Sequence, residues 1–276
     1  MAASFLDPPP IPARTPPHAP FRAGAPRFTP ALRPIAPDAW LAPDSEAHVL
    51  GWKAAMLAHA DTIATIPGSE RAAGEAAMAV LRAAGAPVSN DLAAASRAVS
   101  DDLVVMMRQD AGWRCAALTL TAPTFFALDD VLGAGVAALH RPVPDGAALS
   151  KRIERVFDGL RPGPVLERFN WTLQASAARF TPSSAALRAR AQDADPAEAL
   201  DVLHLRVERQ TITKLAQTGA VVFTIRVCLD PIRRLQPNDQ ACLAAAWRAL
   251  GPEGRAYKGW CAYERLAEAA FDAWGV

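Results

Sequence analysis

The sequence has little of several features that would assign it to a common class of protein. Only four of its 276 residues are cysteine, and none stand in a C-x-x-C pair, so we expect neither a structural zinc site nor an iron–sulfur cluster on this chain. Positive and negative charges nearly cancel, with 29 Lys and Arg against 28 Asp and Glu, which argues against nucleic acid as a partner. No apolar run approaches the roughly 18–20 residues of a membrane span, so no membrane partner is expected.

Familiar motifs are missing as well. The N-terminus has no apolar core of a secretory signal, and sparse, unpaired cysteines fit a reducing compartment, so we expect a cytoplasmic protein. No glycine-rich loop joins a strand to a helix as in dinucleotide-binding and P-loop folds. Neither H-E-x-x-H nor G-x-S-x-G occurs, which leaves no standard metalloprotease or serine hydrolase signature.

Proline is abundant and unevenly placed. Half of the 24 prolines lie at or before Pro43, and such density excludes a regular helix there. Phe5, Phe21 and Phe28 make this region too apolar for a solvated tail, so we expect an arm that wraps across a core. The predicted organisation is a proline-rich N-terminal arm at 1–36 and a single domain at 37–276. Hydrophobic residues make up 51% of the chain, enough for a sizeable core.

Hydrophobic periodicity predicts an α+β fold. Strands are expected at 103–107, 113–120, 168–174, 203–210 and 220–228, and helices at 45–60, 70–84, 125–139, 147–160, 237–250 and 260–274. The turn sequence between the first two strands favours a hairpin. The strands form antiparallel-looking pairs, so we predict a five-stranded antiparallel sheet with helices packed around it.

The strand at 203–210 carries an unusual number of charges. Arg206 and Glu208 share one face at period 2, with His204 before them, whereas Arg209 points toward the apolar face and needs a partner if that face is buried. One interpretation is a solvated strand face with cross-strand ion pairs, for example to Arg226. The other is the polar lining of a functional pocket.

His140 stands at the end of a predicted helix, before a Pro-x-Pro turn. A histidine there can interact with the helix dipole alone. Alternatively, the rigid turn aims the imidazole at a metal or haem iron. On the strand at 168–174, Trp171 follows Asn170 and is a candidate pocket wall.

Taken together, these segments resemble the haem-dependent oxidative N-demethylase family. The matching segments are Leu-His-Arg-Pro-Val-Pro at 139–144, Arg-Phe-Asn-Trp-Thr-Leu at 168–173, Leu-Arg-Val-Glu-Arg-Gln-Thr at 205–211 and Val-Phe-Thr-Ile-Arg at 222–226, with weaker matches at 38–41, 67–69 and 257–259. The resemblance implies a haem-PAS-like fold. It also implies oxidation of a small secondary amine such as dimethylamine, with dioxygen, to a primary amine and formaldehyde.

The resemblance further implies cofactors and partners. The chain would bind haem b through its iron, and a separate reductase subunit would carry flavin and an iron–sulfur cluster. His140 would be the axial ligand. Glu208, Arg206 and Arg226 would form a polar catalytic face, with Glu208 holding a protonated amine.

Four further residues are implied in cofactor binding. Asn170 and Thr211 would orient the cofactor or substrate by hydrogen bonds, Trp171 would form a wall, and Arg209 would exchange roles with Arg206 if its face points to the haem. Two other functions share the fold: a haem-PAS gas or redox sensor, and a PAS-like ligand-binding protein without catalysis. The acidic pair Asp129 and Asp130, where the family leads us to expect a basic residue, leaves the substrate open.

Overall fold

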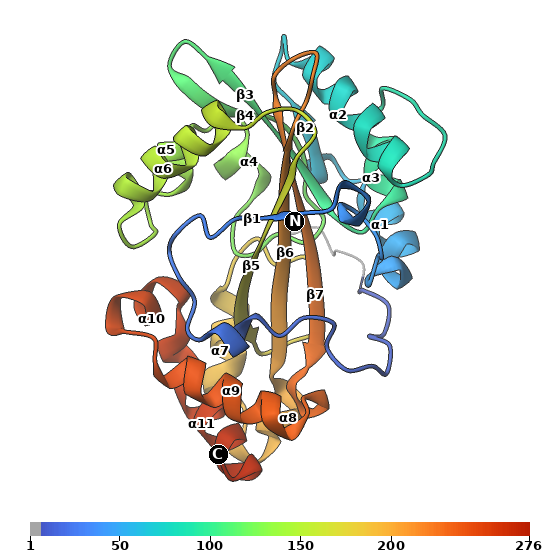
Figure 1. Ribbon diagram of the computed structural model, residues 1–276. Helices are drawn as coiled ribbons and strands as arrows, with labels where there is room; N and C mark the ends of the chain where they lie inside the picture. Colours follow the sequence, from blue (N-terminus) through green and yellow to red (C-terminus); the bar gives the residue numbers. More distant parts are fainter. Residues whose placement is uncertain (1–6) are drawn as a thin grey trace.

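Two long strands organise the whole molecule. The computed structural model describes residues 7–276, and within them the sheet contains seven antiparallel strands in the order β1-β5-β6-β7-β3-β4-β2 (Figure 1). The strands are β1 (Arg33–Ile35), β2 (Ile63–Thr65), β3 (Asp102–Gln109), β4 (Gly112–Thr119), β5 (Val165–Gln174), β6 (His204–Lys214) and β7 (Val221–Pro231). The central strands β6 and β7 have 11 residues each and reach from one end of the molecule to the other.

The prediction of an α+β fold with an antiparallel sheet is confirmed, but the number of strands was wrong. All five expected strands form, and β3 and β4 make the expected hairpin. The two missed strands, β1 and β2, are edge strands of three residues each. A strand this short carries no readable alternation, and β1 lies in the proline-rich arm, where Pro34 faces Leu166 of β5.

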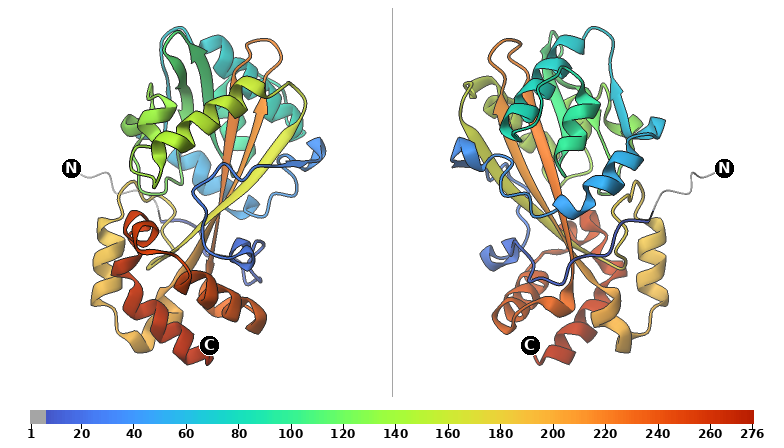
Figure 2. Two further views of the ribbon diagram at one scale, coloured as in Figure 1. Left: turned by 60° about the vertical axis from the view of Figure 1, so that its left-hand side comes forward. Right: turned by 90° about the vertical axis from the view of Figure 1, so that its right-hand side faces the viewer.

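Helices cover the sheet in three groups (Figure 2). They are α1 (Leu50–Met56), α2 (Glu70–Ala83), α3 (Leu92–Ala98), α4 (Leu128–Val131), α5 (Val136–Leu139), α6 (Gly146–Gly159), α7 (Ala185–Asp193), α8 (Ala199–Val202), α9 (Pro237–Arg248), α10 (Pro252–Lys258) and α11 (Glu264–Trp274). The groups α1–α3 and α4–α6 pack on opposite faces of one end of the sheet, and α7–α11 pack at the other end. Each group encloses its own apolar cluster. No helix within residues 7–276 is both long and apolar enough to cross a membrane.

The continuous helix expected at 125–139 does not form. Two short helices, α4 and α5, replace it, because Gly133 between them adopts a φ of +73° that ends a right-handed helix. Phe125 also has a positive φ, of 67°, so the helix cannot begin there. The break leaves His140 at the end of a four-residue helix rather than a long one.

The N-terminal arm lies along the sheet and adds β1 to its edge. Phe21 is buried among the C-terminal helices, and Phe28 packs edge-on against Tyr257 at 5.4 Å. Phe5, also expected to anchor the arm, lies outside the described residues. Arg14 pairs with Glu46 and with Asp230 of β7, so charged as well as apolar contacts hold the arm.

Candidate functional site

The register of the sheet sorts the expected site residues onto two faces. In β5 and β6, Asn170 lies directly opposite Glu208, so both side chains point to the same face. Arg226 of β7 lies opposite Arg209, on the other face. Two predictions for Arg226 are therefore wrong: it does not form a cross-strand pair with Glu208, and it does not share a polar face with Arg206 and Glu208. Glu208 lies opposite Val227, the next residue after Arg226, and neighbouring residues of a strand point to opposite faces.

Arg209 and Arg226 belong to a buried network on their face. The expectation that Arg209 needs a buried partner is confirmed: its Nε donates to Glu167 at 2.7 Å, and its other nitrogens donate to the carbonyls of Ala39 and Trp40. Arg226 pairs with Asp101 at 2.7 Å. All donor groups of these contacts have partners of opposite charge or carbonyl oxygens, the condition under which buried charge is tolerated.

Thr211 takes part in the same network. Its hydroxyl accepts a hydrogen bond from the indole of Trp40 at 2.9 Å and lies 2.7 Å from the hydroxyl of Thr224. Arg226 donates to the carbonyls of Leu41 and Pro43. These contacts fix the segment that follows the arm against the sheet.

Arg206 lies on the same face as Glu208, but all of its guanidinium nitrogens already donate hydrogen bonds within the protein. Its side chain is buried and donates to Thr124 at 2.9 Å, to Gln174 and to the carbonyls of Ala122 and Pro123. Burial lowers the pKa of Arg206 to about 10, against the opposing attraction of Glu208. Arg206 thus ties the loop after β4 to the sheet.

Around Glu208 lies a second polar group, the Glu208 cluster, made of Arg168, Asn170, Glu208, Gln210 and Lys258. Glu208 accepts hydrogen bonds from Gln210 at 2.6 Å and from Asn170 at 3.3 Å. The ammonium of Lys258, at the end of α10, donates to Asn170 Oδ1 and to the carbonyl of Trp171, both at 3.0 Å. Burial lowers the pKa of Lys258 to about 8, and Glu208 opposes this shift.

Arg168 is the unsatisfied member of the cluster. Its Nε is buried and has no hydrogen-bond partner among the described residues. Burial lowers the pKa of Arg168, while the nearby Glu208 raises it. A buried guanidinium donor without an acceptor is unfavourable, so the position suits an anion.

Sequence reasoning missed both Arg168 and Lys258. Arg168 could have been found, since it stands two residues before Asn170 and the strand period places both on one face. Lys258 lies in the weaker family match at 257–259, but no periodicity points to its role, because its contact with Asn170 spans 88 positions of the chain.

His140 follows α5 and points one ring nitrogen at the backbone. Its Nδ1 lies 2.8 Å from the carbonyl oxygen of Val136, which can only accept, so the Nδ1 proton is donated and Nε2 carries the lone pair. Burial lowers the pKa of His140, the hydrogen bond to Val136 raises it, and the charge of Arg168 lowers it. The net lowering of the pKa favours the neutral ring over the cation that interacts with a helix dipole. Residues 7–276 contain no group of His, Cys, Asp or Glu side chains able to hold a metal ion by themselves.

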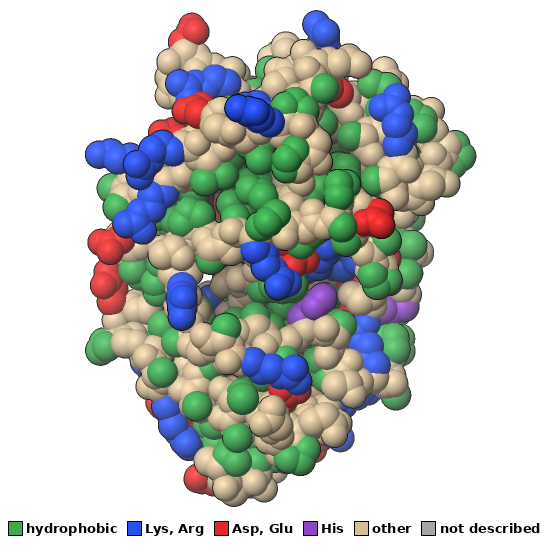
Figure 3. Space-filling model, in the orientation of Figure 1, with side chains coloured by type: hydrophobic (Ala, Val, Ile, Leu, Met, Phe, Trp, Pro, Cys, Tyr) green, Lys and Arg blue, Asp and Glu red, His purple; other side chains and the backbone are tan. Residues whose placement is uncertain are grey.

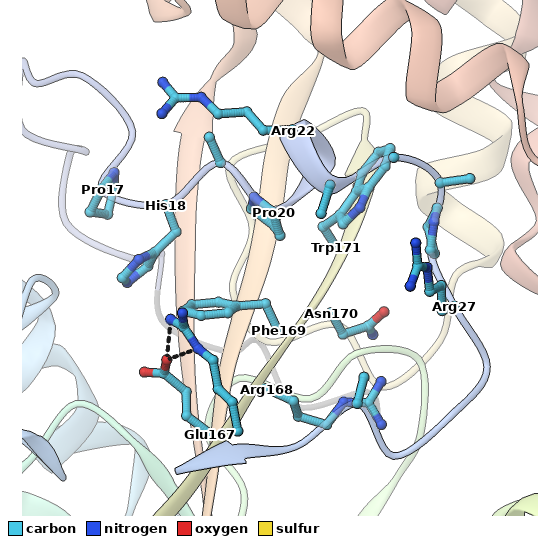
Figure 4. A pocket seen from close by; sticks show the side chains of 17 residues that line it. Pro17, His18, Pro20, Arg22, Arg27, Glu167, Arg168, Phe169, Asn170 and Trp171 are labelled. Carbon is cyan, nitrogen blue, oxygen red and sulfur yellow. Dashed lines mark hydrogen bonds and ion pairs between the residues drawn. The ribbon is translucent and has the colours of Figure 1, made fainter. Parts of the chain in front are cut away.

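A cavity of about 520 Å³ lies between the arm and the exposed edge of β5 (Figure 4). Its lining comprises Pro17, His18, Ala19, Pro20, Arg22, Ala23, Gly24, Ala25, Pro26, Arg27, Ala31, Arg33 and 167–171. Figure 3 shows a hollow in the surface near a purple histidine side chain, with blue Lys or Arg side chains around it. Arg168, Asn170 and Trp171 line the cavity, whereas His140 does not.

The cavity and the Glu208 cluster meet at two residues. Arg168 and Asn170 lie in the cavity wall, and Asn170 also contacts Glu208 and Lys258. On the cluster side, the charge of Arg168 acts on His140. The edge of β5 therefore joins an open cavity to a buried carboxylate.

A comparison with known protein families gives a match. The model of the family described as haem-dependent oxidative N-demethylase, alpha subunit-like, matches residues 78–267, about two thirds of the chain. No curated protein matches the sequence. The match includes His140 and every member of the Glu208 cluster but not the N-terminal arm. The chain therefore belongs to the haem-dependent oxidative N-demethylase alpha-subunit-like family.

Proposed function

We propose that this chain is the haem-binding subunit of an oxidative N-demethylase that acts on a small secondary amine of the dimethylamine kind. The reaction consumes the amine, dioxygen, two electrons and two protons, and it yields a primary amine, formaldehyde and water. The electrons come from a separate reductase subunit with flavin and an iron–sulfur cluster. The observation that carries the proposal is the hydrogen-bonded carboxylate of Glu208, in a chain of this family whose His140 has its Nδ1 held by the carbonyl of Val136.

We further propose that residues 37–276 form a haem-PAS-like domain that binds haem b in the cytoplasm. The residues near His140 fit such a group. The Nδ1–H···O=C bond to Val136 leaves Nε2 able to ligate iron. Partly buried Phe126, Leu139 and Phe223 belong to the apolar cluster beside it and suit a flat, apolar macrocycle.

The protein's own residues hold the amine and its proton. Bound haem iron supplies the reduction of dioxygen and the oxidation of the N-methyl carbon. The Glu208 carboxylate accepts a hydrogen bond from the secondary ammonium and takes its proton when the amine must be neutral. Gln210 and Asn170 fix the carboxylate, and Lys258 fixes Asn170. Because Arg206 has all its donors engaged, its proposed part is to hold the strand and loop around Glu208.

The first experiment records the absorption spectrum of the purified, haem-reconstituted protein. We expect a Soret band in the wild type that shifts or disappears in His140→Ala but not in the control His59→Ala, which lies outside the family match. A Soret band that His140→Ala leaves unchanged contradicts the ligand assignment. Absence of any band in the wild type contradicts the proposed function.

A second experiment measures amine-dependent formaldehyde release with a chemical electron donor. Removing a positioned proton acceptor lowers rates by about 10²–10⁴-fold, so Glu208→Gln should lose activity on this scale and keep its Soret band. The control is Glu253→Gln, an exposed glutamate on α10. Haem binding without amine turnover would instead favour a sensor.

A further inference from the structure

The cavity between the arm and β5 is strongly cationic. Four arginines line it, namely Arg22, Arg27, Arg33 and Arg168. The single carboxylate in the lining, Glu167, is already shared by Arg33 at 2.6 Å and Arg209 at 2.7 Å. A small cationic amine entering here meets an unfavourable field, whereas an anion is attracted.

Two of these guanidinium groups are available to a ligand. Arg22 is engaged by Asp239 and Arg33 by Glu167. Arg27, by contrast, has no ion pair or hydrogen bond with any described residue, and Arg168 has a buried Nε without an acceptor. In Figure 4 Arg27 and Arg168 lie toward the same side of the cavity, with Asn170 between them. This arrangement offers donors for one carboxylate.

Aromatic rings form another part of the cavity wall, where Arg33 lies over the ring of Phe169 at 5.7 Å and pairs with Glu167. The ring of His18 lies 4.9 Å from that of Phe169, and burial lowers the pKa of His18 to about 4, so the imidazole is neutral at physiological pH. Trp171 also lines the cavity, on the side of Arg27 rather than of His18 (Figure 4). A volume of about 520 Å³ lies in the range of sites for ligands much larger than a dialkylamine.

Asn170 lies between two groups of opposite charge, the guanidinium of Arg168 and the carboxylate of Glu208, which are the two poles of the site. This side chain lines the cavity beside Arg168 and contacts the carboxylate of Glu208. Glu208 itself is buried behind Asn170 and does not line the cavity. A ligand with an ammonium and a carboxylate would match both groups, with its carboxylate at Arg168 and its ammonium directed toward Glu208. Dimethylamine satisfies only one pole and leaves the Arg168 donor unpaired.

We infer that the amine demethylated by this protein is an N-methyl amino acid with an apolar or aromatic side chain. The inference rests on the proposed oxidative N-demethylation and replaces the dimethylamine-like substrate with an N-methyl amino acid. It also explains the arm: Arg27, His18 and the rest of the arm lie outside the residues matched by the family model, so the arm adds anion selectivity to a shared amine site.

The test compares two probes that differ only in the carboxylate: N-methyl-L-phenylalanine and N-methyl-2-phenylethylamine. Calorimetry on the haem-loaded protein should show the amino acid binding about 10–100-fold more tightly, the value of a charged hydrogen bond. Arg168→Gln should abolish this preference. Arg161→Gln, an exposed arginine just before β5, should retain it.

Two results would overturn the inference. One is that the amine without the carboxylate binds as tightly as the amino acid, or more tightly. The other is that Arg168→Gln still prefers the amino acid but binds haem more weakly, which would assign Arg168 to the cofactor. Circular dichroism and the variant Arg168→Lys, expected to recover part of the preference, exclude simple misfolding. The two proposals can fail separately. If the protein binds the amino acid selectively but has no Soret band, the proposed oxidation is overturned and carboxylate recognition is supported. If the protein has a Soret band but prefers the amine, carboxylate recognition is overturned and the haem proposal stands.

Discussion

Buried arginines divide into two kinds according to their partners. Arg206, Arg209 and Arg226 have partners for their donors and stabilise segments that cross the sheet. Arg168 lies on the neighbouring strand β5 and is also largely enclosed, yet its Nε has no acceptor among the described residues. An unsatisfied buried donor costs about 1–3 kcal/mol. Because Arg168 also lines a cavity, a ligand there can supply the acceptor.

Replacing Arg226 should destabilise the protein without touching the candidate site. The Arg226 and Asp101 side chains are both about fully buried, and removing one partner of such a pair costs about 3–5 kcal/mol because the other charge stays unpaired. We expect Arg226→Met to lower the free energy of unfolding in urea by this amount. The control is Arg108→Met, whose pair with Asp158 is half exposed and should contribute much less. Equal effects in the two variants would contradict the prediction.

Lys258 gives stability a specific dependence on pH. Its pKa is lowered by burial from 10.5 in the ordinary case to about 8, so between these values the unfolded chain binds the proton and the folded protein does not. The stability contribution of Lys258 is therefore lowest below pH 8 and rises as the pH increases toward 10.5. The difference in unfolding free energy between wild type and Lys258→Met should change in favour of the wild type over this range. The assignment is refuted if the stability of the wild type changes with pH in the same way as the stability of both variants, Lys258→Met and Lys258→Gln.

Short elements, rather than long helices, place His140. The turn between α5 and α6 brings the first residue of α6, Gly146, against the carbonyl of His140, and a Cβ built on Gly146 would lie only 2.0 Å from that oxygen. No side chain larger than hydrogen fits without moving the histidine backbone. Glycine at this position is thus required by close approach and not by a positive φ.

Gly146→Ala should therefore displace His140. We expect a lower melting temperature and, under the proposed function, a weaker or shifted Soret band in the reconstituted protein. Gly159→Ala, at the other end of the same helix, is the matched control because a Cβ there meets nothing within 4 Å. A normal Soret band in Gly146→Ala would show that the imidazole position does not depend on this contact.

Over the whole molecule, the arm connects parts that the sheet alone leaves apart. It pairs with β7 through Arg14 and Asp230, with α9 through Arg22 and Asp239, and with β5 through β1. It thereby closes the cavity over an edge strand that would otherwise present unpaired backbone groups. Cavity and sheet edge are consequently covered by the same segment.

Release of the arm should follow the loss of its buried ion pair. Arg14→Met leaves Asp230 without its partner and Glu46 with Arg179 only. A loss of about 1.5–3 kcal/mol in local stability increases opening by about 10–100-fold. Thermolysin cleavage within 7–33 should accelerate on this scale, with Arg27→Met, which removes an unpaired arginine of the same arm, as the control. Equal cleavage rates would show that apolar contacts alone hold the arm.

The local periodicity of the sequence was sufficient to predict the central strands and the faces of their side chains. The alternation in 203–210 and 220–228 predicted β6 and β7, the faces of Arg206, Glu208 and Arg209, and the need for a buried partner at Arg209, because side-chain direction within a strand depends only on the period of two. Short motifs were sufficient to indicate the family.

Tertiary structure alone decided the rest. The register between strands put Arg226 on the face away from Glu208, and contacts over long chain separations brought Lys258 to Asn170 and the arm to β5. Three-residue edge strands and the break at Gly133 left no periodic signal. The site depends on which atoms remain unpaired after folding, as Arg168 shows, and that property exists only once all partners are in place.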